Sequence, residues 1–281
     1  MNRVATIEAE QMRYSTFHRQ FHKALFALLF ATACLPLAAQ EAQPLNGIAH
    51  VAFRVSDVPK SREFYKTLGW EQAFEFGDDQ GTATSYVKVS DRQFIELYRT
   101  AGSQPLGLMH ICIDAADVEA AAAACQKAGL NPTKPNKARA GNLLFNLQDP
   151  ERRMIEYCQY LPGSLHMTGA GKFLVEGSAS NHMVRVSQQA TDLAAETAFY
   201  TAKLGFVDRG NARLDVPGRY GESIVLEPAA DGWKPRLVFE VRDLKQTAAA
   251  MQKRGVPFTV TGESVTVRDP DGAFLVFAAT R

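Results

Sequence analysis

The chain has 281 residues, of which 46% are hydrophobic, and 31 Lys and Arg residues nearly balance 30 Asp and Glu residues to a net charge of +1. This length suggests one large domain or two small ones, and the hydrophobic content is too high for a disordered chain. The near-neutral charge, without a basic stripe, excludes the electrostatic footprint of a nucleic-acid-binding protein. Four cysteines are too few for a disulfide scaffold.

Residues 1–39 predict an export signal. Three basic residues between positions 13 and 23 precede an apolar run at 24–35, and the small residues Ala38 and Ala39 follow it. This order is typical of a signal peptide, and the run is shorter than the roughly 18 residues that a membrane span needs. We expect cleavage after Ala39 and a periplasmic or secreted protein with no membrane contact. An uncleaved anchor and lipid attachment at Cys34 are the alternatives. Met12 is an alternative start, because Glu8 and Glu10 suit a signal poorly.

The rest of the chain repeats one outline four times. Each repeat has a short strand, then an amphipathic helix that ends at glycine, then further short strands. Phe64-Tyr65 followed by Leu68-Gly69 recurs as Phe199-Tyr200 followed by Leu204-Gly205. Repeats therefore pair into two larger units. The opening strands of the four repeats are Ile48–Val55, Met109–Ile113, Asn181–Val186 and Arg236–Val241.

The two pairs of repeats predict two domains, at residues 46–160 and 179–280. The turn Asp149-Pro150 near the end of the first pair recurs as Asp269-Pro270 near the end of the second. Residues 161–178 between the pairs are rich in Gly and Ser, which indicates a linker that could also pack over a site as a lid. His166 in this linker is expected to be solvated.

Two histidines and two glutamates occupy matching places in the first pair. His50 and His110 lie on the first strands of their repeats, Glu96 and Glu156 lie on the last strands, and 60 residues separate the members of each pair. If the repeats fold alike, two-fold pseudosymmetry can bring all four together. Their atoms suit one divalent ion, which we expect to be Ni, Co, Zn, Mn or Fe(II). One or two open positions on an octahedral ion would receive substrate or water.

These features resemble the vicinal oxygen chelate superfamily, which includes glyoxalase I, bleomycin-resistance proteins and extradiol dioxygenases. The repeats, the Phe-Tyr and Leu-Gly pairs, the Asp-Pro turns and the strand His and Glu residues carry the resemblance over nearly all of residues 46–280. It implies an α+β fold in which four βαβββ modules form two cupped, incomplete barrels. Matched residue by residue, the glyoxalase I pattern of four ligands falls on His50, Glu96, His110 and Glu156.

The second pair departs from this pattern. His182 and Glu227 match the first two ligand positions, but Arg236 and Val276 stand at the third and fourth. One His and one Glu rarely hold a metal alone, so we expect a degenerate structural half. Arg236 is also a weaker candidate for binding substrate, because an arginine in the cup could receive a carboxylate or phosphate.

Three further residues share a strand with a ligand. Tyr98 follows Glu96 by two residues, so it is expected to line the cup and is a candidate substrate contact. Cys112 and Cys158 follow His110 and Glu156 by two. The resemblance places their strands side by side, where either a disulfide or two buried thiols fit, and buried thiols are the commoner outcome.

The resemblance implies a metal-dependent enzyme acting on a small substrate chelated through vicinal oxygens. The leading hypothesis is a glyoxalase-like isomerase or lyase, in which Glu96 or Glu156 acts as general base. One alternative is an extradiol ring-cleaving dioxygenase that uses Fe(II) with His50, His110 and Glu156. The other is a small-molecule-binding protein without turnover, as in bleomycin-resistance proteins. A homodimer would also be consistent with this family.

Overall fold

The computed structural model describes residues 45–279, which form sixteen strands and five helices in an α+β arrangement of two eight-stranded sheets. The expected export signal at 1–39 lies outside the described residues. Across the described part of the chain, no helix is both long and apolar enough to span a membrane. Both sheets have the βαβββ plan that the repeats predicted, so the fold class is confirmed.

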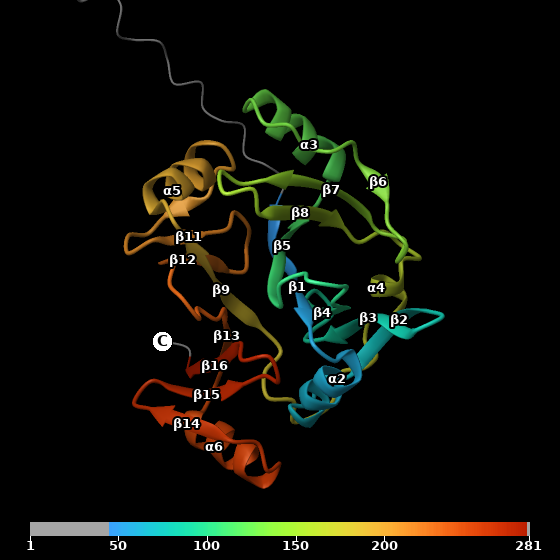
Figure 1. Ribbon diagram of the computed structural model, residues 1–281, viewed down its shortest axis with the longest axis vertical. Helices are drawn as coiled ribbons and strands as arrows, with labels where there is room; N and C mark the ends of the chain where they lie inside the picture. The colour runs from blue at the N-terminus through green and yellow to red at the C-terminus, as the bar shows by residue number, and fades with distance from the viewer. Residues whose placement is uncertain (1–44, 280–281) are drawn as a thin grey trace, which may run out of the picture. The chain divides into compact units, whose positions relative to one another are not determined.

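The first sheet curls into half a barrel, with strand order β2-β3-β4-β1-β5-β8-β7-β6 (Figure 1). Its two central strands, β1 and β5, are antiparallel, and each runs parallel to the last strand of its own module, β4 or β8. The elements are β1 (Leu45–Val55), α2 (Val58–Thr67), β2 (Gln72–Asp78), β3 (Gly81–Lys88), β4 (Phe94–Arg99), β5 (Gly107–Ala115), α3 (Val118–Lys127), β6 (Asn136–Lys137), β7 (Leu143–Gln148) and β8 (Met154–Gln159).

The second sheet repeats this plan with strand order β10-β11-β12-β9-β13-β16-β15-β14. A short helix, α4 (Leu165–Thr168), lies in the segment that joins the two sheets. The other elements are β9 (Met183–Ala190), α5 (Leu193–Ala202), β10 (Val207–Asp208), β11 (Arg213–Asp215), β12 (Ser223–Pro228), β13 (Arg236–Val241), α6 (Leu244–Lys253), β14 (Phe258–Thr261), β15 (Ser264–Arg268) and β16 (Phe274–Ala279).

An aspartate begins each of the four long helices. Asp57, Asp117, Asp192 and Asp243 are the N-caps of α2, α3, α5 and α6, and each carboxylate accepts a hydrogen bond from a backbone N–H of the first turn. These bonds satisfy donors that the helix itself leaves free. Because the cap recurs in every module, residues can be counted from it to find equivalent positions in different modules.

Strand alternation separates a core face from a cup face in the first sheet. Val51, Phe53 and Ile111 point to one side and join the buried apolar core, whereas their neighbours His50 and His110 point to the other side. Successive side chains of a strand point to opposite faces. The core therefore anchors the strands from one side and leaves the opposite face to polar chemistry.

Two equivalent side chains link the domains reciprocally. Gln93, just before β4, hydrogen-bonds the backbone N and O of Met183 on β9 at 2.8 and 2.9 Å. Glu222, just before β12, accepts a hydrogen bond from the backbone N of Ile48 on β1. Trp70 adds an apolar link, because its indole packs against Phe239 at 4.6 Å between ring centroids, with the two rings tilted by 40°.

Candidate metal centre

Three buried side chains of the first domain converge on Nε2 of His50. This nitrogen lies 3.4 Å from Oε1 of Glu96, 3.2 Å from Oε1 of Glu156 and 3.3 Å from Nε2 of His110. All four residues are buried, with less than a tenth of their surface exposed. The structure thus brings together the four residues that the repeat spacing selected.

The register of the central strands explains the convergence. Ala52 on β1 pairs with Glu96 on one side and with His110 on the other. One step along the same face, Cys112 on β5 pairs with both His50 and Glu156. Paired residues of neighbouring strands share a face, so the four polar groups form two adjacent rows on the concave side.

His50, Glu96 and His110 offer atoms that all lie within 4.8 Å of one another, and Glu156 reaches the same nitrogen of His50, so the spacing is compatible with ligands of a single ion. Metal bonds of about 2.1 Å place neighbouring ligand atoms roughly 3.0–3.4 Å apart in octahedral or tetrahedral geometry. The observed 3.2–3.4 Å separations around His50 match this range. Two imidazoles and two carboxylates suit a divalent cation, whose charge would balance two buried negative groups that are otherwise crowded.

Burial and mutual charge set the proton affinities of the four groups. Burial raises the pKa of Glu96 to about 7, although the nearby His50 opposes this, and burial lowers the pKa of His110 to about 4. Burial also lowers the pKa of His50, but the carboxylates of Glu96 and Glu156 outweigh it and hold that pKa well above its ordinary value. Burial favours the protonated form of Glu156, but its hydrogen bond with His50 outweighs this and lowers its pKa.

Side chains around the four groups orient them. The hydroxyl of Tyr98 donates to Oε2 of Glu96 at 2.9 Å, so Tyr98 lines the cup by holding a carboxylate. The hydroxyl of Tyr160 lies 3.4 Å from Nδ1 of His50, on the side of the ring away from the other three groups. Such outer contacts set the orientation of a ligating imidazole or carboxylate.

Sequence reasoning missed two neighbours in the cup. Tyr86 on β3 pairs with Glu96, and Asn146 on β7 pairs with Glu156, so both side chains point into the cup. They lie 60 residues apart, which is the signal that could have found them. Oδ1 of Asn146 is buried without a hydrogen-bond partner among the described residues.

Residues 47–157 match the family described as the Glyoxalase/Bleomycin resistance protein/Dioxygenase superfamily. This match places the first domain in the vicinal oxygen chelate superfamily. No curated protein sequence matches the chain. The match covers the whole set His50, Glu96, His110 and Glu156, so the superfamily cup and the converging groups are the same part of the molecule.

Solved structures agree with the superfamily fold. The 2,3-dioxygenase LapB from Pseudomonas sp. KL28 has a TM-score of 0.66 and 15% identity, and the match covers 85% of this chain and 94% of that one. The Mn(II)-bound glyoxalase from Novosphingobium aromaticivorans has a TM-score of 0.66 and 15% identity, over 84% and 83% of the two chains. Homoprotocatechuate 2,3-dioxygenase from Arthrobacter globiformis has a TM-score of 0.63 and 15% identity, over 89% and 84%. At this identity the likeness shows the fold.

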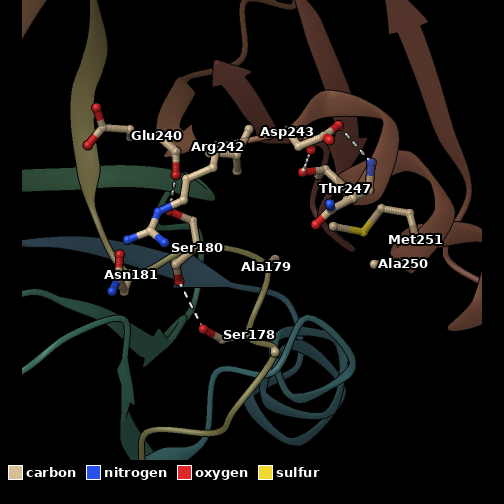
Figure 2. Close-up of a pocket in the computed structure, with 13 residues that line it drawn as sticks. Ser178, Ala179, Ser180, Asn181, Glu240, Arg242, Asp243, Thr247, Ala250 and Met251 are labelled. Carbon is tan, nitrogen blue, oxygen red and sulfur yellow. Dashed lines mark hydrogen bonds between the residues drawn. The ribbon is translucent and has the colours of Figure 1, made fainter. Parts of the chain in front are cut away.

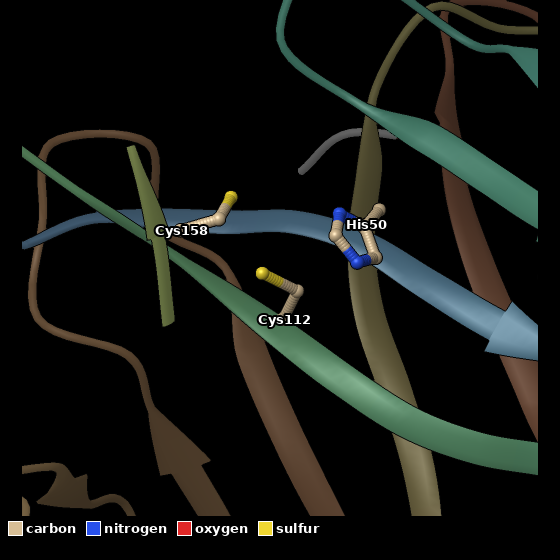
Figure 3. A group of neighbouring side chains, drawn as sticks. All are labelled: His50, Cys112 and Cys158. Atoms are coloured by element: carbon tan, nitrogen blue, oxygen red, sulfur yellow. The ribbon is translucent and has the colours of Figure 1, made fainter. Parts of the chain in front are cut away.

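Two thiols lie beside the vicinal oxygen chelate cup. Cys112 and Cys158 are both free and fully buried, and their sulfur atoms lie within 4.8 Å of each other and of a ring nitrogen of His50. Figure 3 shows the two thiols close together on one side of the imidazole. The sequence allowed either a disulfide or two buried thiols, and the structure has two buried thiols.

The expectation that His166 is solvated is wrong. Its side chain is only 2% exposed, because the segment that joins the sheets packs over the cup of the first domain as a lid. The imidazole stacks on Tyr160 at 4.2 Å between ring centroids and contacts Phe74 and Phe94 edge to face. The linker composition predicted an irregular segment correctly, but it could not show which apolar surface the segment covers.

The second domain has no ligand set at the equivalent positions. His50 and His110 each lie seven residues before their helix caps, Asp57 and Asp117. Seven residues before the caps of α5 and α6 are two arginines, and the strand pairings place two valines at the carboxylate positions. The four equivalents, in chain order, are Arg185, Val225, Arg236 and Val276.

His182 and Glu227 therefore do not match the first two ligand positions, and that alignment is corrected. His182 precedes β9 and bonds Glu222 and Glu240, both at 3.1 Å, near the link between the domains. Glu227 lies two residues beyond the carboxylate position, at the equivalent of Tyr98, and accepts a hydrogen bond from Trp233 at 2.7 Å. The local signal, a histidine near a strand start, was three residues out of register.

Arg236 and Val276 were aligned correctly. Arg236 is exposed, and its guanidinium pairs with Glu227 and lies over the ring of Phe274. Its role as a substrate contact stays a prediction.

A separate cavity of 380 Å³ lies where the linker meets the second domain (Figure 2). Its lining includes Ser180, whose hydroxyl donates to the backbone O of Glu240 at 2.6 Å, and Thr247, whose hydroxyl donates to the backbone O of Asp243 at 2.8 Å. None of the predicted site residues lines this cavity. The candidate centre therefore remains in the first domain.

Proposed function

We propose that this protein is a metal-dependent enzyme whose first domain chelates a small substrate through two neighbouring oxygens. The single observation that carries the proposal is the set of three groups within 3.4 Å of Nε2 of His50. Buried carboxylates and imidazoles at ligand spacing are costly without a cation to compensate them. The superfamily match over residues 47–157 supports the same reading.

Residues His50, His110, Glu96 and Glu156 would hold the ion, which when bound supplies a Lewis acid for the vicinal oxygens. Tyr98 holds one oxygen of Glu96 at 2.9 Å and leaves the other oxygen facing the centre. Glu96 would take a proton from a substrate carbon held beside the ion, because its second oxygen faces the centre. The favoured reaction is accordingly that of a glyoxalase-like isomerase or lyase.

A specific observation also favours the extradiol dioxygenase as a second candidate. His50, Glu96 and His110 offer ligand atoms that all lie within 4.8 Å of one another. Two histidines and one carboxylate with open positions are the set typical of non-haem Fe(II) oxygenases. In that case the carboxylate is Glu96 or, as the sequence first indicated, Glu156, and the remaining glutamate is surplus.

Export is part of the proposal. The basic region, apolar run and small residues of positions 1–39 support a protein that acts in the periplasm or outside the cell. Fractionation of the producing cells, with detection of the chain at its shortened mass, tests this point. A full-length chain in the cytoplasm would contradict it.

Metal analysis of the protein purified from its own compartment tests the function. We expect one ion per chain in the wild type, loss of the ion in His110→Ala, and full retention in the matched control Arg236→Ala. Nickel, cobalt or zinc with turnover that needs no oxygen supports the isomerase or lyase, whereas iron with oxygen-dependent catechol cleavage supports the dioxygenase. If the wild type holds no stoichiometric ion and His110→Ala behaves like it, both enzyme proposals fail. A binding protein without turnover then remains.

A further inference from the structure

Four arginines lie on one face of the second sheet, the face that is equivalent to the cup of the first domain. Strand pairing places all four there, and we call this surface the arginine face: Arg185 on β9, Arg213 on β11, Arg236 on β13 and Arg268 on β15. The first domain has no arginine at the equivalent positions, which are, in the same order, His50, Tyr86, His110 and Gln148. The first domain thus gathers carboxylates on this face, and the second gathers guanidinium groups.

Three acidic strand residues share the arginine face, and each already has a cationic partner. The pairs are Asp215 with Arg213, Glu227 with Arg236, and Glu240 with His182. Arg185 and Arg268, in contrast, form no ion pair with any residue between positions 45 and 279. Two guanidinium groups therefore remain unbalanced on this face, so it attracts anions.

Arg185 is the least compensated of the four arginines. Its side chain is partly buried, and of its nitrogens only Nε has a hydrogen-bond partner among the residues described, the Oγ of Ser223 at 3.4 Å. Burial lowers the pKa of Arg185 and the nearby cation of Arg213 lowers it further, whereas Asp215 opposes both. A guanidinium stays charged in proteins, so an anion bound here would relieve the repulsion and occupy the two terminal nitrogens.

Three valines lie beside these arginines on the same face. Val225 and Val276 stand at the two former carboxylate positions, and Val238 pairs with both Arg185 and Val276. All three are partly exposed, whereas their equivalents in the first domain are buried: Glu96, Glu156 and Cys112. The side chains of Arg213 and Arg236 are 40% and 45% exposed, so a ligand can reach this face from solution. An apolar floor with a few charged groups suits an organic anion better than a bare inorganic one.

We propose that the arginine face binds a small organic anion through a carboxylate or phosphate group, with Arg185 as the principal contact. A guanidinium donates two parallel hydrogen bonds to either group, which a lysine cannot do. Arg213 and Arg236 flank the anionic group, and the valines contact the apolar part of the molecule. This second binding site is separate from the candidate metal centre and does not rest on the proposed function.

Isothermal titration calorimetry of the full chain at low ionic strength tests the site with three probes: phenyl phosphate, benzoate and inorganic phosphate. We expect at least one of the two aromatic probes to bind roughly tenfold or more tightly than inorganic phosphate, because the valines stabilise only an organic ligand. Tighter binding of phenyl phosphate identifies the anionic group as a phosphate, and tighter binding of benzoate identifies it as a carboxylate. Equal affinity for inorganic phosphate and both aromatic probes, or no binding of any probe, overturns the proposal.

Substitution of Arg185 tests the principal contact. Arg185→Gln should weaken binding of the tightest probe by roughly tenfold or more, and Arg185→Lys should recover part of the loss, since it keeps the charge without the paired donors. The matched control Lys253→Gln removes one positive charge from the last turn of α6, a helix that packs on the core side of the sheet through Met251. This control should bind like the wild type. Equal losses in Arg185→Gln and Lys253→Gln would indicate a general charge effect and refute the site.

Two further variants complete the test. His110→Ala, which should lose the metal, must bind the probe as the wild type does, and loss of binding would place the probe at the metal centre instead. Should Arg185→Gln not fold, Val225→Asp decides, because a carboxylate at this partly exposed position must weaken binding of an anion. Unchanged affinity in Val225→Asp contradicts the proposal.

Discussion

The two domains share one topology and one register but differ at every predicted ligand position. Where the first domain has His50 and His110, the second has Arg185 and Arg236, and valines replace both glutamates. The second sheet nevertheless keeps its helix caps, its strand pairings and its buried core. The fold therefore does not need the four polar groups, so their presence in the first domain calls for a functional reason.

The largest expected effect is on metal affinity, which should differ most between substitutions of His50 and of its equivalent, Arg185. His50→Ala should weaken metal binding by more than 100-fold, since even residues that only orient a ligand typically contribute about 10–100-fold. Arg185→Ala should leave both the metal content and the affinity unchanged. Equilibrium titration with Co(II) or Zn(II), followed by metal analysis, measures both variants. Equal losses in the two variants would mean that the domains share the site.

A second prediction concerns the equivalent residues that link the domains. Glu222 is fully buried and accepts hydrogen bonds from Arg92, Gln93, His182 and the backbone N of Ile48. Glu222→Ala leaves these donors unpaired and should lower the free energy of unfolding by about 3–5 kcal/mol.

Gln93→Ala at the equivalent position leaves Glu222 three of its four donors and should lower the free energy of unfolding by about 1–3 kcal/mol. Urea denaturation of the metal-free chain measures both values. A smaller loss for Glu222→Ala than for Gln93→Ala would show that the buried carboxylate contributes little to this link.

Histidines outside the ligand set should respond to pH with opposite signs. The pKa of His166 is lowered to about 3 by burial, so between about pH 6.5 and 3 the unfolded state binds the proton and acid destabilises the fold. The pKa of His182 is raised by its hydrogen bond to Glu222, so its contribution is present below pH 6.5 and is lost as the pH rises through the raised value.

The difference in unfolding free energy between wild type and His166→Phe should change by about 2 kcal/mol from pH 6.5 to pH 5, with the wild type losing more. For His182→Gln the difference should change in the other direction, with the wild type gaining as the pH falls. Urea denaturation of the metal-free proteins at both pH values checks the signs. Parallel pH profiles for all three proteins would refute the assignment of these two groups.

The smallest expected effect compares Tyr98 with Glu227, its equivalent in the second domain. Tyr98→Phe removes the hydroxyl that holds Glu96 and should weaken metal binding by roughly tenfold. Glu227→Gln should not change metal binding. Because Glu227 pairs with the exposed Arg236, we expect this variant to lose less than about 1 kcal/mol of stability. Metal titration and thermal unfolding measure the two variants. No change in Tyr98→Phe would show that Glu96 keeps its position without the hydroxyl.

Local signals were sufficient to predict much of this fold. The glycines after the helices, the Asp-Pro turns and the strand alternation act within a few residues, so they identify similar modules from the chain alone. The match of His50 with His110 and of Glu96 with Glu156 followed from the 60-residue spacing, because equal offsets in equal modules lead to equal places.

Register in the second domain could not be predicted in the same way. His182 lies at the start of a strand and looks like His50, but only the pairing of Arg185 with Ser223 shows that the arginine occupies the ligand position. A shift of an odd number of residues also moves a side chain to the other face of the sheet. Strand pairing is a long-range property that a single strand sequence does not contain.

The sequence by itself determined the modules, the repeat pairs and the set of four polar groups that one metal ion could use. Only the tertiary structure decided that Gln93 and Glu222 link the domains, that Cys112 and Cys158 stay as buried thiols, and that His166 enters the cup. The physical reason is that the surroundings of His166 come from four separate elements and the linker. Their apolar surfaces meet only when the whole first sheet has curled and the lid has closed over it.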